Sequence, residues 1–458
     1  MSILRPKRTA VSGSFREVLA VAFPLILASS CHAVNMFVDR LMLTRYSPAA
    51  GAASFTGGIT GFTVACLFVG TISYTGTFVA QYFGAGQHRR IGLVVWQGVF
   101  LALIGAVVLA GIIPFADKLF GVFGHDPQVT GLEITYFRII TGGVFLVLSG
   151  VALSCFWAGR GRTEVVLAIS VAAMLCNLPF NYLLIYGVGK IPPLGVTGAA
   201  MGTLAAELVA DGLYLALFLH RGNRTRFGTT NWRWKGTLVR RMLKFGIPNG
   251  VQLGLDLLAF NMFSLLLGSY GVAVHEAAGI TFGINNIAFC PVMGVGQTVA
   301  ILTGQAIGAR DIPRARKSIG SAFILVTAYS LLMIVLFVFG YDLVLAPFVR
   351  PGDQSQLEAL RCAKYMLQFI SAYLLFDGVN ITLSNALRGA GDTRFTMYVF
   401  ATVGIGAFAG SCLLLSSLAA PWWSLWIAFD GEILLLSGVF FWRYRQGKWT
   451  RMRVIAPK

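Results

Sequence analysis

The sequence predicts an all-α integral membrane protein whose twelve transmembrane helices form two six-helix lobes. Three observations support this prediction: the apolar composition, the recurrence of long apolar segments and an internal duplication. Of the 458 residues, 56% are hydrophobic and only 12% are charged, whereas typical soluble domains carry about 25% charged residues. With a mean hydropathy of +0.74, the apolar residues exceed what one soluble core can bury, so lipid must solvate much of the surface.

Segments long enough to cross a membrane recur along the whole chain. A spanning helix needs about 20 largely apolar residues. The expected spans are 17–41, 52–78, 93–114, 131–157, 164–187, 195–219, 242–269, 277–303, 319–345, 362–386, 395–418 and 422–442. Strands of an outer-membrane barrel would be shorter and would alternate apolar and polar residues, so the pattern favours helices.

The basic residues indicate how the chain is oriented. Most of the 36 Lys and Arg residues fall in the two tails and in the connections after even-numbered spans. Because cytoplasmic loops are enriched in Lys and Arg, we expect both termini to be cytoplasmic and the protein to lie in the cytoplasmic (inner) membrane. The net charge of +18 is therefore a topology signal, and no nucleic-acid partner is expected.

Motifs that occur once in each half indicate a duplication. They are Pro24 and Pro248, Gln81-x-x-Gly84-Ala85 and Gln305-x-x-Gly308-Ala309, and Ser154…Gly159-x-Gly161-x-Thr163 and Ser384…Gly389-x-Gly391-x-Thr393. Because each half holds six spans, a pseudo-two-fold axis along the membrane normal should relate the halves. We expect an N-lobe at 1–220, a cytoplasmic linker at 221–241 and a C-lobe at 242–458. We also expect helix kinks at the two prolines, since proline removes a backbone hydrogen bond.

Acidic residues inside the spans point to function. An ionised group at the bilayer centre costs ~2.5–3.5 kcal/mol on insertion scales, and such groups usually face a cavity or pathway. Asp256 and Asp377 lie closest to the midplane. Tyr373, Asp377, Asn380 and Ser384 share one face of a helix, as expected beside a water-filled cavity. A structural hydrogen bond between helices is the alternative for both acids.

Further polar stripes lie in the first half. Ser29, His32, Asn35 and Asp39 form one, and Asn177 and Asn181 are one turn apart on another helix. A salt bridge from Asp39 to Arg40 or Arg45 is the alternative to a functional role for Asp39. Two other sets of acids have roles that the sequence leaves undefined: Thr203, Glu207 and Asp211 on one face, and Asp430 and Glu432, two residues apart.

Nucleotide-hydrolysis and enzyme motifs do not occur. The sequence has no GxxxxGK[ST], HExxH or GxSxG. We therefore expect a protein that is not an enzyme, that has no cofactor besides a coupling ion, and that is driven by an ion gradient or by the gradient of its own substrate.

Several motifs, taken in order, resemble the multidrug and toxic compound extrusion (MATE) transporters over nearly the whole chain. They are Val38-Asp39-Arg40-Leu41-Met42-Leu43, Val79-Ala80-Gln81-Tyr82-Phe83-Gly84-Ala85-Gly86, the segment 177–187 beginning Asn177-Leu178-Pro179, Gly195-Val196-Thr197-Gly198-Ala199-Ala200, Gly246-Ile247-Pro248, Gly304-Gln305-x-x-Gly308, and Leu387-Arg388-Gly389-Ala390-Gly391-Asp392-Thr393. The resemblance implies a monomeric protein whose two lobes form a V. Such a protein exports cationic drugs in exchange for sodium ions or protons.

The resemblance also implies where the coupling ion binds. In the second lobe, the family's acidic positions fall on Asp256 and on Asp377 with Tyr373, and a position that is commonly glutamine is Glu276 here. In the first lobe, the family's sodium ligands fall on Asp39, Asn177, Asn181 and Thr203. Because Asn181 stands where the family has a second aspartate, this sodium site should be weakened, and we expect coupling mainly through the second lobe.

Two alternatives remain at this point. A lipid-linked oligosaccharide flippase of the same superfamily would need an arginine-lined cavity for its anionic substrate, often with two extra helices. A membrane-embedded enzyme or channel would need motifs that the sequence lacks. The sequence defines neither the substrate nor whether sodium or protons drive the transport.

Overall fold

The computed structural model describes residues 13–122, 124–190, 192–349 and 354–455, and in these residues the regular structure is entirely helical. The α-helices are α1 (Phe15–Tyr46), α2 (Pro48–Ser73), α3 (Thr75–Gly84), α4 (Arg89–Ala110), α5 (Ala116–Gly121), α6 (Pro127–Gly142), α7 (Val144–Ala158), α8 (Thr163–Tyr186), α9 (Val196–Phe218), α10 (Arg221–Phe227), α11 (Gly236–Gly268), α12 (Val272–Ala309), α13 (Ile312–Phe339), α14 (Tyr341–Leu345), α15 (Gln354–Ala390), α16 (Thr393–Val399), α17 (Gly410–Ser417) and α18 (Trp422–Arg445). A π-helical stretch, Phe400–Ala409, joins α16 to α17.

The long helices match the predicted number of spans. Eleven helical stretches in the described residues are long and apolar enough to cross a membrane, and a twelfth is formed if α6 and α7 count as one bent span. The all-helical membrane fold is thus confirmed. α1 and α11 continue through Pro24 and Pro248 without interruption.

The fourth predicted span, 131–157, is not one continuous helix. It bends by 45° between α6 and α7, at the glycine pair Gly142–Gly143. A Cβ on Gly143 would lie 2.3 Å from a methyl carbon of Leu204. Because Gly143 has no side chain, the bent span can pack closely against Leu204 of α9. This packing between two helices cannot be inferred from the hydropathy of one segment.

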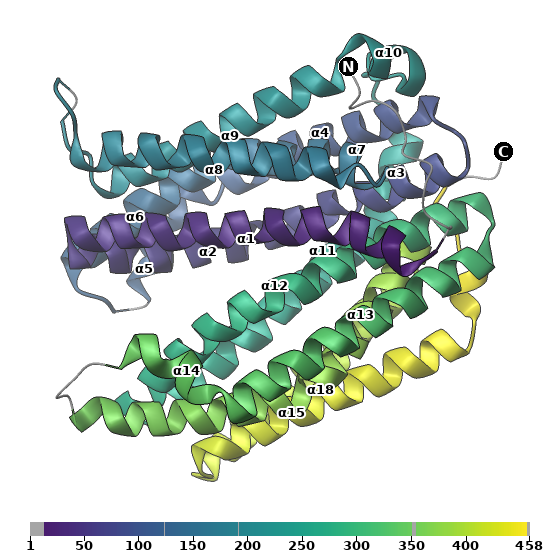
Figure 1. The fold of residues 1–458 in the computed structure, drawn as a ribbon. Helices are drawn as coiled ribbons and strands as arrows, with labels where there is room; N and C mark the ends of the chain where they lie inside the picture. The colour runs from purple at the N-terminus through teal and green to yellow at the C-terminus, as the bar shows by residue number, and fades with distance from the viewer. Residues whose placement is uncertain (1–12, 123, 191, 350–353, 456–458) are drawn as a thin grey trace.

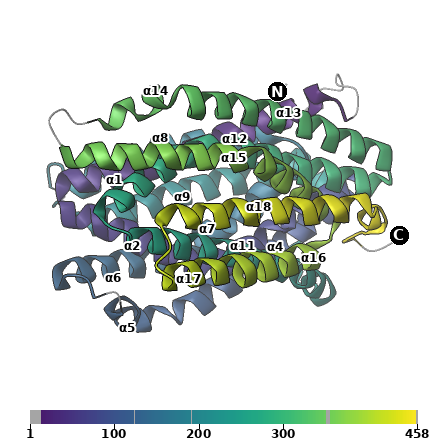
Figure 2. The same ribbon diagram turned by 90° about the horizontal axis from the view of Figure 1, so that it is seen from below.

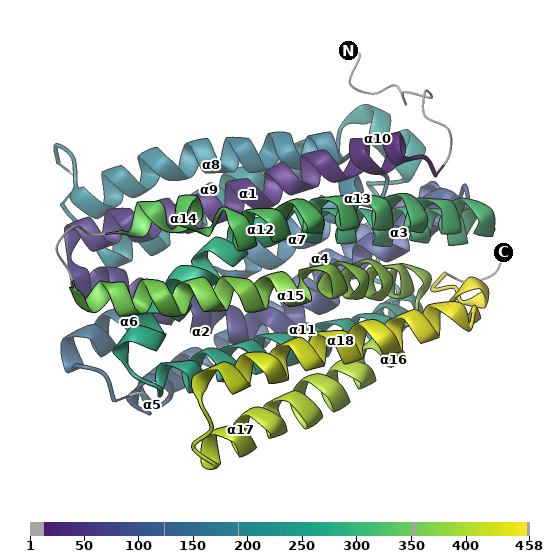
Figure 3. The same ribbon diagram turned by 60° about the horizontal axis from the view of Figure 1, so that its bottom comes forward.

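The two halves of the chain meet at one end of the molecule and diverge toward the other (Figure 1). Helices α1 to α9 form one group and α12 to α18 the other, and the described chain begins, before α1, and ends, after α18, at the end where the groups meet. This end is called the terminus end below. Turned views show that the long helices of both groups follow the same long axis (Figures 2 and 3).

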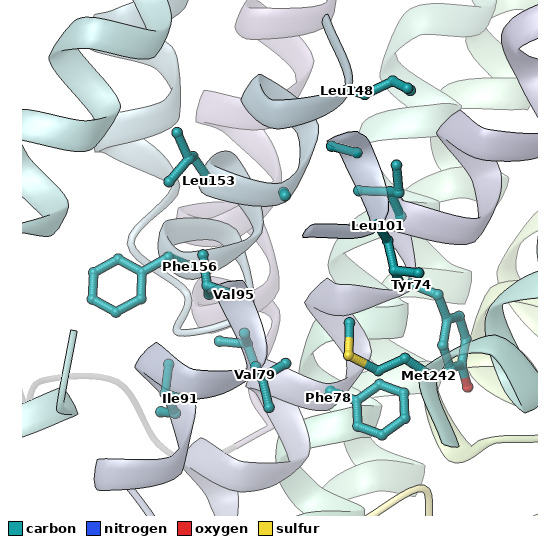
Figure 4. Close-up of a cluster of buried hydrophobic side chains, with 14 of the residues drawn as sticks. Tyr74, Phe78, Val79, Ile91, Val95, Leu101, Leu148, Leu153, Phe156 and Met242 are labelled. Carbon is teal, nitrogen blue, oxygen red and sulfur yellow. The ribbon is translucent and has the colours of Figure 1, made fainter. Parts of the chain in front are cut away.

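Each half has its own apolar core, but the start of α11 belongs to the core of the first. Side chains from α3, α4 and α7, among them Phe78, Val95 and Phe156, pack together with Met242 of α11 (Figure 4). In the second half, Phe263, Phe429 and Trp426 form an aromatic core in which the rings of Phe263 and Phe429 stack with their centroids 5.0 Å apart. The start of α1 likewise packs into a core cluster of the second half through Val18, Val21 and Ala22, so the halves are packed bodies joined through α1 and α11.

Glycines let helices of opposite halves cross closely at the terminus end. A Cβ on Gly84 would lie 1.9 Å from the carbonyl oxygen of Gln305, and one on Gly308 would lie 2.1 Å from that of Gln81. A Cβ on Gly70 would similarly lie 2.6 Å from the Cα of Gly250. Small residues at such crossings are typical of membrane helices, since close backbone approach drives their association.

Candidate functional site

The predicted first-half residues lie together, where α1, α8 and α9 meet. The Nδ2 of Asn181 donates to Oδ1 of Asp39 and, at 3.0 Å, to Oδ1 of Asn177. The hydroxyl of Thr203 lies 3.5 Å from Oδ2 of Asp39. We call these four residues the N-lobe cluster. Its four side chains come from three helices, and the amide of Asn181 connects α8 to α1.

Local packing explains how the N-lobe cluster is assembled. Asn177 and Asn181 are buried and, one turn apart, face the same way. A Cβ on Gly202 would lie 2.1 Å from Oδ1 of Asn181, so a glycine at this position is what lets α9 approach α8 so closely. The same oxygen of Asn181 is buried and has no hydrogen-bond partner within the described part of the chain.

The salt-bridge alternative for Asp39 is wrong in this structure. The guanidinium of Arg40 lies over the ring of Phe55, 4.2 Å from its centroid. None of the ion pairs among the described residues includes Asp39. Tyr136 of α6 completes the surroundings of the cluster, since its hydroxyl interacts with Thr203 and with the Asp39 carboxylate. A lone tyrosine in a span gave no sequence signal for this contact.

A second acidic group lies among α11, α15 and α18. The carboxylate of Glu432 interacts electrostatically with those of Asp256 and Asp377, and the Nδ2 of Asn380 donates to Oδ1 of Asp377 at 3.3 Å. Tyr373, one turn before Asp377, interacts electrostatically with the carboxylates of Asp377 and Asp430. We call Asp256, Tyr373, Asp377 and Glu432 the C-lobe cluster.

The structure does not bring Glu276 into the C-lobe cluster. Glu276 lies in the second turn of α12, just after the tight connection from α11, whereas Asp256 lies three turns before that connection. At 1.5 Å per residue the two side chains start from backbone positions that differ in depth by about 12 Å. The third acid of the cluster is instead Glu432, a buried residue of α18, for which the sequence provided no role.

A further acidic pair lies in the first half, on α9. Asp211 accepts a hydrogen bond from the hydroxyl of Ser149 on α7. A Cβ on Gly150 would lie 2.8 Å from Oδ1 of Asp211 and 3.9 Å from Oε2 of Glu207, so both acids face α7 there. Glu207 and Asp211 thus share a face of α9, as predicted, but this face points away from the N-lobe cluster. Of the three polar residues predicted on α9, only Thr203 belongs to that cluster.

The duplicated Gln-x-x-Gly motif joins the halves at the terminus end. Gln81 of α3 donates to the carbonyl oxygens of Gly389 (3.1 Å) and Ala390 (3.3 Å) at the end of α15, and accepts from the backbone N–H of Val454 (2.9 Å). In the reciprocal contact, Gln305 of α12 donates to the carbonyl oxygen of Gly159 (2.9 Å) after α7. Each glutamine therefore caps a helix end of the other half.

Other contacts between the halves lie at the same end. Glu17 of α1 forms an ion pair with Arg314 of α13 (2.7 Å), and the hydroxyl of Tyr74 donates to the carbonyl oxygen of Arg388 (2.8 Å). Asn249 donates to the carbonyl oxygen of Gly70 (2.6 Å). Among the residues that the structure describes, no hydrogen bond joins the halves closer to the opposite end than this last one.

Comparison with known proteins places this architecture in a family. The MatE family model matches residues 24–183 and 250–408, one stretch in each half. A relative named probable multidrug resistance protein NorM, from Bradyrhizobium diazoefficiens, is 26% identical over 95% of this chain and 94% of its own length. The multidrug resistance protein PmpM of Pseudomonas aeruginosa is also 26% identical, over 88% of this chain and 84% of its own.

Solved structures share the fold. One, described as the outward-facing conformation of a multidrug resistance MATE family transporter of the MOP superfamily, superposes with a TM-score of 0.85 at 16% identity, over 98% of this chain and all of its own. A MOP superfamily transporter from Pyrococcus furiosus, described as having a binding pocket of reverse polarity, also has a TM-score of 0.85, at 17% identity over 97% of this chain and all of its own.

Proposed function

We propose that this chain, which belongs to the MATE family of transporters, exports amphipathic and in particular cationic organic molecules in exchange for sodium ions or protons. The observation that supports this most is the presence of carboxylates inside the spans of both halves that form no ion pair with any described residue. The named relatives are multidrug resistance proteins. The flippase alternative gains no support from these comparisons.

Unpaired carboxylates supply a simple means of exchange. A carboxylate in a span can hold either a coupling cation or a cationic substrate, and competition between the two makes the export of one depend on the entry of the other. Parallel repeats of this kind alternate access by rocking about the site between them. With both termini in the cytoplasm, the contacts at the terminus end would close the cytoplasmic side, and the structure would represent the outward-facing state.

The second half is the better candidate for coupling. In the N-lobe cluster, Asn181 directs its Nδ2 toward Asp39 and Asn177, and a sodium ion needs oxygen ligands there. A half-turn of the amide would present Oδ1 instead, but the site would still hold one carboxylate, Asp39. The C-lobe cluster holds three carboxylates with Tyr373 beside them, and the buried guanidinium of Arg388 interacts with one of them, Asp256. With three carboxylates against one guanidinium, the cluster still offers more anionic charge than the single carboxylate of the N-lobe cluster to a proton, a sodium ion or a cationic drug.

The assembly around this function is proposed as follows. The N-lobe comprises 1–220, the linker 221–241 and the C-lobe 242–458, and the chain acts as a monomer in the cytoplasmic membrane. No cofactor besides the coupling ion is proposed. Because Met242 of α11 packs into the first-half core and Val21 of α1 into a second-half core cluster, the two lobes would move relative to each other about the starts of these two helices.

Efflux from proteoliposomes tests the proposal. The full chain, loaded with ethidium as a cationic probe, should export it when a sodium gradient or a pH gradient is imposed, and the two gradients applied separately identify the ion. Asp377→Asn should lower gradient-driven efflux at least about tenfold, since it removes a charge used in exchange. The matched control is Asp342→Asn, an exposed acid of α14. Unchanged efflux by Asp377→Asn would refute the assignment of this site.

A further inference from the structure

A basic cavity lies at the terminus end of the second half, apart from both acidic clusters. It has a volume of about 900 Å³ and lies between the start of α11, the start of α16 and the segment 451–455. Six basic side chains line it: Arg240, Arg241, Lys244, Arg394, Arg451 and Arg453. Lys244 is twelve residues before Asp256 on α11, or about 18 Å along the axis, so the cavity is not part of the C-lobe cluster.

No acidic residue in the described part of the chain forms an ion pair with the basic side chains of this cavity. Asp392, two residues before Arg394, is already paired with Arg443 at 2.7 Å. Arg453 donates to the carbonyl oxygen of Gly308 (3.0 Å), and its Nε is buried without a partner. An anion is therefore the missing complement.

The cavity lies at the depth of lipid headgroups. α11 has 33 residues and is about 50 Å long, so it extends well beyond a hydrocarbon core of ~30 Å. Ile247, one turn after Lys244, is 45% exposed, and Tyr398, one turn after Arg394, is 62% exposed. Exposed apolar and aromatic side chains directly beyond a basic ring are typical of the boundary between headgroups and acyl chains.

We propose that this cavity binds the phosphate of an anionic phospholipid headgroup. Basic pockets between transmembrane helices on the cytoplasmic side bind such headgroups, and arginine suits phosphate because its planar group donates two parallel hydrogen bonds. The apolar side chains of Leu243, Phe245 and Ile247 also line the cavity and provide a surface for the first carbons of the acyl chains. A soluble phosphate compound would gain nothing from that surface.

Native mass spectrometry of the purified full chain in detergent tests the proposal. One phosphatidylglycerol molecule should remain bound under conditions that remove phosphatidylcholine. The test variant is Arg240→Gln with Arg394→Gln, two exposed residues whose side chains make no hydrogen bond in the described structure, so folding should be unaffected. With each basic residue near an anionic surface contributing a roughly fivefold factor, affinity for phosphatidylglycerol should fall about 30-fold.

A matched control removes the same charge elsewhere at the terminus end. Arg316→Gln with Lys448→Gln changes two exposed basic residues outside the cavity and should leave the affinity within about twofold. Equal retention of phosphatidylglycerol and phosphatidylcholine, or equal loss in both double variants, would overturn the proposal. Displacement of the lipid by millimolar inorganic phosphate or ATP would overturn it too, because the ligand would then be a soluble phosphate.

Discussion

Gln81 should stabilise the contact between the two halves at the terminus end. Its replacement by alanine measures the free energy that it contributes to this closed state. The side chain is wholly buried and makes three hydrogen bonds to the other half, two donated to Gly389 and Ala390 and one accepted from Val454. A net value of ~0.5–1.5 kcal/mol per bond, in which the exchange with water is already counted, gives about 3 kcal/mol for three bonds. That changes the ratio of closed to open terminus ends about 150-fold.

The chain provides a closely matched control in Gln97. This residue is also wholly buried and also makes three hydrogen bonds, two donated to Leu93 (3.2 Å) and Arg233 (2.9 Å) and one accepted from Lys235 (2.9 Å). All of these partners lie in the first half or in the segment before α11. Gln97→Ala should therefore lower thermal stability about as much as Gln81→Ala while leaving the closed state of the terminus end unchanged.

Electron–electron double resonance in nanodiscs measures the separation of the halves. Spin labels at positions 224 on α10 and 317 on α13, in a background without the seven native cysteines, report on the terminus end. Gln81→Ala should add a population at longer distance. Gln305→Ala removes only one bond between the halves, so its effect should be about fivefold. Identical distance distributions in the native and Gln81→Ala proteins, or the same shift in Gln97→Ala, would refute the reasoning.

Two further predictions concern the acidic clusters and use the same vesicle efflux assay. Asn181→Asp adds a second carboxylate beside Asp39, so the sodium concentration that gives half-maximal efflux should fall about tenfold. An unchanged concentration would show that sodium does not bind at the N-lobe cluster. Glu432→Gln should lower gradient-driven efflux severalfold because Glu432 interacts with Asp377. Glu276→Gln should leave efflux within about twofold of the native value. A larger loss in Glu276→Gln than in Glu432→Gln would contradict the composition of the C-lobe cluster.

Much of this architecture follows from local sequence patterns. The number of spans is set by apolar length, which each segment carries by itself. The N-lobe cluster was equally accessible, because Asn177 and Asn181 repeat at one helical turn and the family resemblance supplies Asp39 and Thr203. Its hydrogen bonds connect residues that the sequence had already placed on the correct helices.

The C-lobe cluster was only partly predictable. Asp256 and Asp377 were identified from their depth, and Tyr373 from the helix face that it shares with Asp377. Glu276 was assigned from the family's position rather than from depth, and it lies about 12 Å away from Asp256 along the helix axes. Glu432 was not recognised because the face that α18 turns toward α11 and α15 depends on helix packing. The bend at Gly143 has the same origin, since its cause is Leu204 on another helix.

The two halves have equivalent residues where they contact each other at the terminus end, but their charged sites differ. At the offset of 224 residues that relates Gln81 to Gln305, Asp256 corresponds to His32, and Asp39 corresponds to Phe263. Phe263 is buried in the aromatic core of the second half, where its ring stacks on that of Phe429, so it has no room for an ion. The two halves can therefore perform the same movement, because their crossing motifs are equivalent. They cannot bind the coupling ion in the same way, because at this offset neither Asp39 nor Asp256 has an acidic counterpart in the other half.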